Sequence, residues 1–403
     1  MSFFLELLFA LSCILILHSY IIYPISLVVA NIFIRPQKSA LATEAKDLPV
    51  VSCITSVYNE ADIIERKVHS VLNSEYPIDK IKLFIGSDAS DDGSNELIKA
   101  LKIKYHNIYF FSFNSRRGKT NVINDLIEEA YKVTPQSDNH IILFTDANVI
   151  LNSETIAILV SEFINPAVAV VDSRIIQKNL RSDGISLAEG QYMSLETKLK
   201  FLEGRVLGCM MGAFGGCFTI RSSYLQKIPN HLIVDDFYIT MMAMIKNGIS
   251  LLNPNASCIE GIPNQMHEEF KRKSRISIGN FQNLAIFWDR LYKKPLRLAY
   301  AFFSHKFLRW IGPFLFLGML FSSLGLWLLG SNQFGYINLS LVALIFGIPV
   351  LDFVLQYLGI HLRPFRAIRY FFYMNLALLN GFIIYVSGKQ LVTWQPPKRS
   401  NIS

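Results

Sequence analysis

Charged residues are scarce in this sequence. They make up 17% of its 403 residues, whereas soluble domains usually carry roughly a quarter. Apolar residues account for 51%. A wholly soluble enzyme, a disordered chain and a fibrous protein are therefore disfavoured, and we expect much of the chain to contact lipid. The net charge of +8 does not indicate nucleic acid as a partner, because Lys and Arg gather in the cytoplasmic loops of membrane proteins.

Several short motifs that identify common protein classes are also missing. The five cysteines form no CxxC pair and no metal-ligand spacing, so we interpret them as reduced, buried thiols. No P-loop GxxxxGK[ST] occurs, and no GxGxxG follows the first expected strand, which disfavours ATPases and dinucleotide-binding enzymes. The first residues are not basic and precede no small-residue cleavage site, so a signal peptide is not expected.

The N-terminal residues are long and apolar enough for a membrane anchor. Residues 2–33 contain one acidic residue, Glu6, and one histidine, His18, but no Lys or Arg. A spanning helix needs about 20 apolar residues. We therefore expect an N-terminal transmembrane anchor over residues 1–36. Basic residues follow this segment and none precede it, which places the next domain in the cytoplasm.

A second apolar region occupies residues 310–388. Two spans are expected near residues 310–330 and 336–360, and a third apolar run covers about 370–387. Four full spans would put the basic residues of the polar tail, 389–403, outside, against the positive-inside rule. The last run is therefore either a third C-terminal span or an interfacial or re-entrant segment.

Three ionisable residues in or beside these spans allow two interpretations each. Asp352 lies within an apolar span, where a carboxylate is either functional or paired with a polar neighbour. His305 and Arg309 precede the first C-terminal span, where they either anchor the helix at the interface or take part in function.

The middle of the chain, residues 47–270, has the pattern of a cytosolic α/β domain. Short β-branched runs alternate with helical stretches, which predicts a mostly parallel sheet with crossover helices. Strands are predicted at Pro49–Tyr58, Ile81–Asp88, Ile108–Phe113, Ile141–Thr145 and Ala167–Ile176, and helices at Ala61–Leu72, Ser94–Lys104, Lys119–Ala130 and Ser153–Phe163. A linker is expected at 36–47 and an interfacial amphipathic segment at 271–309.

Polar clusters follow three of these strands. They are Ser56–Glu60, Ser87–Ser94 and Thr145–Asn148. Ligands of open α/β sheets bind beyond the carboxyl ends of the strands, so three such clusters predict one site. Between them, Arg116–Lys119 opens a helix, where basic side chains and free N–H groups suit a phosphate. A nucleotide diphosphate with a carboxylate-bound divalent metal is the expected ligand.

Further along the chain, residues 208–216 are rich in glycine, which allows close approach of the backbone to a ligand or tight packing. Asp235 and Asp236 then precede a hydrophobic helix, where they either favour the helix dipole or supply a general base. The basic cluster Lys271–Arg275 either faces lipid headgroups or holds a leaving-group phosphate.

In this order, these motifs resemble the membrane-bound family-2 glycosyltransferases, the group of the hyaluronan, chitin, cellulose and poly-N-acetylglucosamine synthases. The resemblance covers about residues 47–290. It implies a GT-A fold, which is a Rossmann-like nucleotide-sugar-binding domain, flanked here by one N-terminal and two or three C-terminal transmembrane helices. It also implies an inverting transfer from a nucleotide sugar, usually a UDP-sugar, with Mg2+ or Mn2+.

The resemblance assigns roles residue by residue. Asp88 matches the carboxylate that contacts the uracil or ribose, with Asn59 and Glu60 beside it, and Lys119 matches the basic position near the nucleotide. Asp146 matches the first acid of the DxD motif on the diphosphate and metal, and Arg275 matches the arginine of the QxxRW motif. Asp236 matches the catalytic base, and Asp235 stands where the family often has Glu. Gly215, Gly216 and Arg272 are expected on the acceptor side.

Two positions depart from the family pattern. Asn148 replaces the second acid of the DxD motif, so the expected metal ligands are Asp146 and a neutral, weaker amide. The QxxRW motif reads Arg272 to Ile276, without its Gln and Trp. In processive synthases that Trp lies against the acceptor sugar, so its absence slightly favours limited extension over long-chain polymerisation.

The sequence therefore predicts a multi-pass protein of a bacterial inner membrane with a cytoplasmic catalytic domain. Its expected partners are a nucleotide-sugar donor, a saccharide or lipid-linked acceptor, the bilayer and subunits of an envelope complex. A polysaccharide synthase and a single-sugar transferase acting on a lipid-linked acceptor both remain open. The alternative from another class is a catalytically silent nucleotide-sugar-binding subunit, which Asn148 favours and the set Asp88, Asp146 and Asp236 disfavours.

Overall fold

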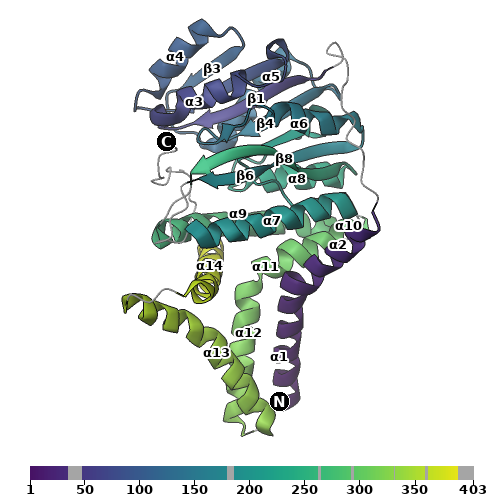
Figure 1. Ribbon diagram of the computed structural model, residues 1–403, viewed down its shortest axis with the longest axis vertical. Coiled ribbons are helices and arrows are strands. Elements are labelled where there is room, and N and C mark those ends of the chain that lie inside the picture. Colours follow the sequence, from purple (N-terminus) through teal and green to yellow (C-terminus); the bar gives the residue numbers. More distant parts are fainter. Residues whose placement is uncertain are drawn as a thin grey trace.

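The computed structural model describes residues 1–34, 48–178, 186–261, 265–291, 295–330, 332–358 and 362–388. The expected linker at 36–47 and the polar tail at 389–403 lie outside these residues. Figure 1 shows an α/β domain above a layer of helices, from which further helices extend downward. Each part follows from a different sequence pattern.

One eight-stranded sheet organises the α/β domain. Its order is β3-β2-β1-β4-β7-β6-β8-β5. The strands are β1 (Val50–Val57), β2 (Ile81–Asp88), β3 (Ile108–Phe113), β4 (His140–Thr145), β5 (Ile150–Leu151), β6 (Val168–Lys178), β7 (Cys217–Arg221) and β8 (Ile249–Gly261). The first four are mutually parallel, and the β4–β7, β6–β7 and β5–β8 pairs are antiparallel. The five predicted strands are confirmed, and three further strands were not anticipated.

Helices cover both faces of the sheet, each with an apolar side against it. They are α3 (Ala61–Leu72), α4 (Ser94–Lys104), α5 (Lys119–Val133), α6 (Thr155–Ser161) and α8 (Asp235–Ile245). One buried cluster includes residues of α3, α4 and α6, and a second includes residues of α5 and α8. The four predicted helices are confirmed, with α6 continued by a short 3-10 turn to Ile164.

A layer of long helices lies beneath the sheet (Figure 1). It contains α7 (Ser186–Leu207) and α9 (Met266–Leu291), with the shorter α10 (Leu296–Ala301) and α11 (Leu308–Trp310). α7 contacts both β8 and α2 (Tyr23–Ile32), so it touches the sheet on one side and the N-terminal helices on the other. The segment that links the α/β domain to the apolar helices is thus itself helical and packed.

The apolar helices are α1 (Ser2–Leu17), α12 (Gly312–Leu328), α13 (Asn332–Tyr357) and α14 (Arg363–Val386). Helices over Ser2–Ile32, Gly335–Leu355 and Pro364–Val386 are long and apolar enough to cross a membrane, and a bent pair around Trp310 makes up to four. A π-helical turn, His18–Ile22, followed by Pro24, separates α1 from α2, as expected for a bend.

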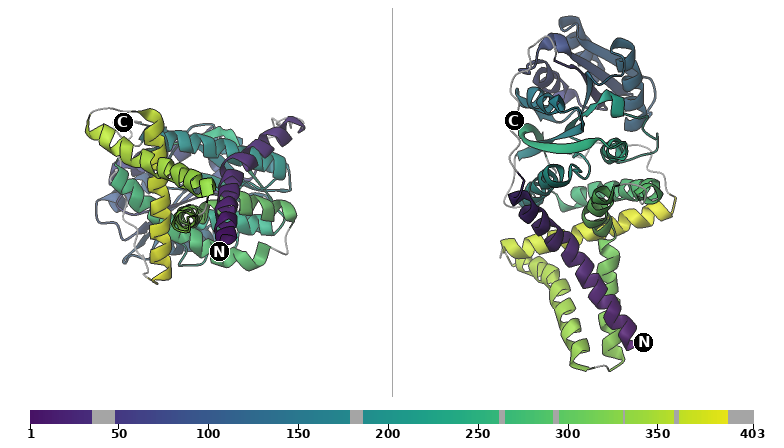
Figure 2. Two further views of the ribbon diagram at one scale, coloured as in Figure 1. Left: turned by 90° about the horizontal axis from the view of Figure 1, so that it is seen from below. Right: turned by 90° about the vertical axis from the view of Figure 1, so that its right-hand side faces the viewer.

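α14 differs from the other apolar helices in direction. Figure 2 shows α14 running across α1 and α12 at the level of the α7–α9 layer. α14 packs along α9, and an ion pair joins its Arg369 Nε to the buried Asp352 of α13, with an N–O distance of 3.0 Å. Asp352 is therefore paired with a polar neighbour, which is the structural one of its two interpretations.

Candidate active site

The three predicted polar clusters lie side by side. They follow β2, β1 and β4, which are consecutive in the sheet and parallel, so their carboxyl ends meet at one edge. A cavity of about 1110 Å³ opens at this edge and continues to the α7–α9 layer. The predicted site residues that line it are Glu60, Asp88, Lys119, Asp146, Asn148, Gly215, Gly216, Asp235, Asp236, Arg272 and Arg275.

Asn59 is the predicted site residue that the cavity lining does not include. Its side chain exchanges two hydrogen bonds with Asp91, donating to the carboxylate at 2.8 Å and accepting from the backbone N–H at 3.0 Å. Its φ of 52° is a conformation that Asn tolerates better than most residues. Asn59 therefore holds the loop after β1 against the loop after β2.

Asp88 organises the basic segment that opens α5. Its buried carboxylate accepts hydrogen bonds from the backbone N–H groups of Arg117, at 2.5 Å, and Gly118, at 3.0 Å. The Arg116 side chain donates to the same carboxylate at 3.2 Å and stacks over the Tyr58 ring, 3.3 Å from its centroid. This arrangement places an arginine and an aromatic ring in the lining of the cavity.

Lys119 lies between Asp146, at the end of β4, and the adjacent residues Asp235 and Asp236 at the start of α8. Its Nζ lies 2.8 Å from Asp146 Oδ1 and 3.9 Å from Asp235 Oδ1. Burial alone would lower the pKa of the Lys119 ammonium, but these two carboxylates hold it above its ordinary value. A permanent positive charge therefore lies between the strand end and the start of α8.

A buried lysine fixes the segment that carries Asp146 and Asn148. Lys67 of α3 donates to Thr145 Oγ1 at 2.5 Å and to the Val149 carbonyl at 2.6 Å. Burial lowers the pKa of Lys67 to about 8. Asn148 Nδ2 donates to Glu260 of β8 at 3.3 Å, which leaves the amide oxygen of Asn148 as an acceptor.

These oxygens limit how a metal ion could bind. Among the described residues, no group of three or more His, Cys, Asp or Glu side chains is placed to hold one. Asp146 and the Asn148 carbonyl are nevertheless hard oxygen ligands, and Mg2+ often takes only one or two protein ligands beside substrate phosphates. The residues fit a Mg2+ or Mn2+ ion whose coordination is completed by a bound diphosphate.

The glycine-rich loop fixes the position of Asp236. The Ala213 N–H donates to Thr240 Oγ1 at 3.2 Å, and Thr240 Oγ1 donates to the Asp236 carbonyl at 2.8 Å. The Phe214 N–H donates to Asp172 of β6 at 2.9 Å. A Cβ atom on Gly215 would clash with the Asp236 carboxylate, so the loop lies directly against it.

Asp236 has the protonation behaviour expected of a general base. Burial raises the pKa of its carboxyl group to about 6, the adjacent Asp235 adds to the rise, and Lys119 opposes it. The group is mostly ionised at pH 7 yet more basic than a solvated aspartate. Both aspartates lie in the first turn of α8, whereas the sequence pattern placed them before the helix.

Arg272 has partners that the sequence did not indicate. It lies 2.9 Å from Glu189 of α7 and 2.8 Å from Glu269 of α9, and Lys273 lies 3.2 Å from Glu189. Tyr370 of α14 donates a hydrogen bond to the same Glu189. Glu189 thus joins α7 to α9 and α14, with Arg272 at the wall of the cavity, while Arg275 lines the cavity one turn further along α9.

His305 belongs to a buried polar network. Its Nε2 lies 2.6 Å from Glu196 and its Nδ1 2.7 Å from Glu203, both on α7, and Arg309 pairs with Glu196 at 2.8 Å. Tyr23 of α2 donates to Glu203 at 2.9 Å. The network ties α2 and the segment that carries His305 and Arg309 to α7. Both residues also line the cavity, so the anchoring and functional interpretations both stand.

Several residues around the site were not found from the sequence. They are Lys67, Asp172, Glu196, Lys200 and Glu203. α7 itself was not predicted, so nothing marked its charged residues as neighbours of the cavity. Lys67 lies on a predicted amphipathic helix, where a lysine usually points to solvent. For Asp172 the available signal was its place in the apolar start of β6, because a buried aspartate is unusual.

Known proteins resemble this chain in sequence and in fold. The model of the family "Glycosyl transferase family 2" matches residues 52–228. A poly-beta-1,6-N-acetyl-D-glucosamine synthase of Staphylococcus epidermidis is 23% identical over 65% of this chain and 62% of its own length. A beta-monoglucosyldiacylglycerol synthase of Trichormus variabilis is 23% identical over 66% of this chain and 56% of its own. The chain thus aligns with less than two thirds of each relative.

A solved structure resembles the chain over nearly its whole length. It is the mannosyltransferase PcManGT of Pyrobaculum calidifontis in complex with GDP-Man and Mn2+, with a TM-score of 0.70 and 17% identity. The match covers 94% of this chain and 99% of the other. The GT-A fold expected above is therefore confirmed, and the apolar helices are included in the likeness.

Proposed function

We propose, from the premise that the chain is a family 2 glycosyltransferase with a GT-A fold, that it transfers a sugar from a nucleotide diphosphate sugar to an acceptor that reaches the site from the membrane. The observation that carries this proposal is the cavity itself. It runs from the strand ends, where Asp88 and Asp146 lie, past Asp236 to the apolar helices α2 and α14. The proposed donor site, the proposed base and the apolar helices therefore line one cavity.

The donor would bind at the strand ends. Arg116 and Tyr58 present a stacked pair to the base or ribose, beside Asp88. The diphosphate would lie near Lys119, whose ammonium suits phosphate oxygens, with Arg275 on the far wall. A UDP-sugar is the expected donor, since that is the usual donor of the family this sequence resembles.

A divalent metal would lie between Asp146, Asn148 and the donor. Its chemistry would be to withdraw charge from the diphosphate as the nucleotide leaves. The Mn2+ bound by the structurally similar mannosyltransferase supports such a metal here. The neutral Asn148 ligand predicts weaker metal binding than two carboxylates would give.

The transfer step follows from the position of Asp236. An acceptor hydroxyl oxygen attacks the anomeric carbon, its proton passes to the Asp236 carboxylate, and the bond from that carbon to the diphosphate breaks. Attack from the face opposite the diphosphate inverts the configuration. Lys119 and Arg275 would stabilise the charge that grows on the leaving nucleoside diphosphate.

The acceptor side favours a lipid or lipid-linked acceptor over a free polymer. The relatives include both a polysaccharide synthase and a glycolipid synthase, so their names support either product. Within this chain, the cavity opens among apolar side chains of α2, α7 and α14, and Ile276 lines it where a polymerising enzyme would carry Trp. We therefore propose a membrane protein of the bacterial envelope that glycosylates a lipid-linked acceptor.

The test is transfer from labelled nucleotide sugars by the full-length protein in membranes containing native lipid, with Mg2+ or Mn2+. We expect label in the lipid extract. Asp236→Asn should lower turnover by about 10²- to 10⁴-fold, the usual contribution of a general base, while UDP binding stays within twofold. Asp79→Asn, an exposed aspartate before β2 and away from the cavity, is the matched control and should leave turnover unchanged.

Three results would contradict parts of this proposal. A high-mass, glycosidase-sensitive product would identify a polysaccharide synthase instead. Normal turnover in Asp236→Asn would move the base elsewhere, and Asp235 would be tested next. UDP binding without transfer from any donor would identify a silent nucleotide-sugar-binding subunit.

A further inference from the structure

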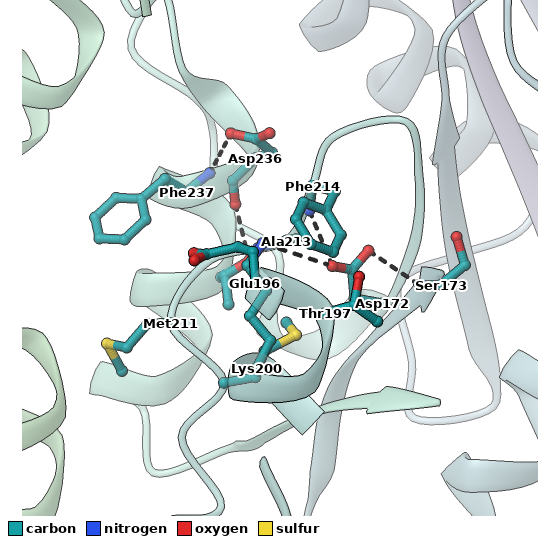
Figure 3. A network of polar contacts seen from close by, with 12 residues as sticks. Asp172, Ser173, Glu196, Thr197, Lys200, Met211, Ala213, Phe214, Asp236 and Phe237 are labelled. Carbon is teal, nitrogen blue, oxygen red and sulfur yellow. Dashed lines mark hydrogen bonds and ion pairs between the residues drawn. The ribbon is translucent and has the colours of Figure 1, made fainter. Parts of the chain in front are cut away.

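Lys200 of α7 is a buried lysine beside the catalytic centre. Its side chain is 3% exposed, and its Nζ lies 4.0 Å from Asp172 Oδ2 and 3.3 Å from the centroid of the Phe214 ring. Figure 3 shows Lys200 and Asp172 around the glycine-rich loop that carries Phe214, with Asp236 nearby. No hydrogen bond from the ammonium to any described residue is present, although an ammonium carries three donors.

Asp172, the carboxylate nearest to Lys200 among the described residues, lies beyond hydrogen-bond distance of the ammonium. Burial raises the pKa of the Asp172 carboxyl group to about 7, so this group is only partly ionised at neutral pH. Burial and the charge of Lys306 lower the pKa of Lys200 to about 8, although the carboxylates of Asp172, Glu196 and Asp236 oppose this shift, and the ammonium form still predominates at pH 7. A buried positive charge with unused donors favours an anionic ligand.

Neighbouring cations on this side of the cavity are paired differently. Arg309 and Lys306 lie 2.8 and 3.2 Å from Glu196, and Arg272 lies 2.9 Å from Glu189. Each of these ion pairs has hydrogen-bond geometry, whereas the carboxylate nearest to Lys200 is a full 4.0 Å away. Lys200 is thus the cation of this group best able to accept a new partner.

Part of the cavity that Lys200 lines is apolar. It is lined by Pro24, Val28, Leu195, Leu199, Phe371 and Met374. These side chains come from α2, α7 and α14, two of which belong to helices long and apolar enough to enter a membrane. The cavity volume of about 1110 Å³ exceeds the roughly 300–1,000 Å³ range of ligand pockets, which leaves room for a second ligand beside the donor.

We infer that Lys200 binds the phosphate group of a phosphate-bearing lipid acceptor, whose hydrocarbon chain lies among the apolar residues of α2, α7 and α14. The phosphate stays intact in the reaction. A hydroxyl group of the same acceptor, on a sugar next to the phosphate, would then face Asp236. This inference rests on the proposed function, and it adds a phosphate-binding role that the family motifs do not assign.

The test measures lipid binding without turnover. The full-length protein in phosphatidylcholine nanodiscs is titrated with a polyisoprenyl monophosphate and with the matched polyisoprenol, and bound lipid is counted by native mass spectrometry. We expect the wild type to prefer the phosphate by about 10- to 100-fold, the range of a hydrogen bond to a charged group. Lys200→Met should bring this preference close to one, and Lys200→Arg should retain most of it.

Two controls separate binding from folding. Lys227→Met removes an exposed lysine far from the cavity and should leave the preference unchanged. UDP binding by each variant reports whether the donor site is intact, and inorganic phosphate should not displace the lipid, because it lacks the chain. A purely structural role for Lys200 would weaken UDP binding and both lipids alike.

Equal affinity of the wild type for the two lipids would overturn the inference, and so would an undiminished preference in Lys200→Met. Displacement by inorganic phosphate alone would also overturn it, since the site would then bind free phosphate. No arm requires sugar transfer. Failure of the proposed function in the transfer assay is therefore distinguishable from failure here.

Discussion

Gly215 lies where the glycine-rich loop meets the first turn of α8. Its φ is +82°, in the left-handed region that side chains other than glycine rarely adopt. A Cβ atom there would meet the Asp236 carboxylate before any other group. Both the backbone conformation and the space beside the proposed base therefore require glycine.

Gly215→Ala should displace the Asp236 carboxylate and lower turnover by at least tenfold, with UDP binding largely retained. The measurement is transfer rate beside UDP affinity. Gly330→Ala is the matched control, because Gly330 has a φ of +62° but no atom within 4 Å of its Cβ position. It should share the backbone strain of about 1 kcal/mol without the loss of turnover. Equal activity in both variants would show that Asp236 is free to move.

At the scale of elements, α7 connects the parts of the molecule. It contacts β8 and β6 of the sheet, α2 and α10 below it, and α14 at its side. Its residues Glu196 and Glu203 pair with His305, and its Glu189 pairs with Arg272. A helix with partners on several sides carries no single apolar stripe, which is why the 3.6-residue pattern did not reveal it.

The contact between α9 and α14 depends on small side chains. A Cβ atom on Gly381 of α14 would clash with the Ser274 carbonyl and the Ser277 side chain of α9. Ser277 also donates a hydrogen bond to the Leu378 carbonyl at 2.7 Å. The two helices therefore approach closely at this point.

Gly381→Leu should push α14 away from α9 and destabilise the protein by about 1–3 kcal/mol, the usual cost of overpacking. The measurement is the thermal unfolding midpoint of the purified protein in detergent. Gly347→Leu on α13 is the control, since nothing lies within 4 Å of that Cβ position. An unchanged midpoint for Gly381→Leu would mean that α14 does not pack on α9 in this way.

At the scale of the whole molecule, the direction of α14 bears on topology. Figure 2 shows α12 and α13 leaving the α7–α9 layer and returning to it, while α14 lies across them. We expect α14 to lie in the membrane interface, which would leave α1, α12 and α13 as three crossings. The end of α14 would then lie on the same side as the α/β domain, which would also satisfy the positive-inside rule for the basic residues after it.

We therefore expect a fluorescent-protein fusion at the C-terminus to fold and fluoresce, because it would remain in the cytoplasm. A periplasmic reporter, alkaline phosphatase, inserted after Gly330 in the connection between α12 and α13 should be active, because that turn lies on the opposite side. The measurement is the activity of each reporter in intact cells. A dark C-terminal fusion with an active phosphatase at the same terminus would show that α14 crosses the membrane.

The sequence by itself determined what depends on local pattern. The polar clusters after β1, β2 and β4 were predicted to form one site, because parallel strands end at a common edge whatever lies beyond them. Periodicity was enough for the helices α3, α4 and α5, whose apolar faces meet a single sheet. The family resemblance then assigned Asp88, Asp146 and Asp236, which the structure brings to one cavity.

The tertiary structure alone decided what depends on distant partners. β7 runs antiparallel between β4 and β6, and β8 contains Pro254 opposite a register shift at Ser173, so neither strand has a regular local pattern. Lys200 and Asp172 are far apart in sequence, yet their buried side chains lie 4.0 Å apart. α14 is as apolar as a spanning helix but packs along α9. Composition shows how apolar a segment is. The direction of a helix and the partners of a buried side chain depend instead on which surfaces of the folded protein are still uncovered.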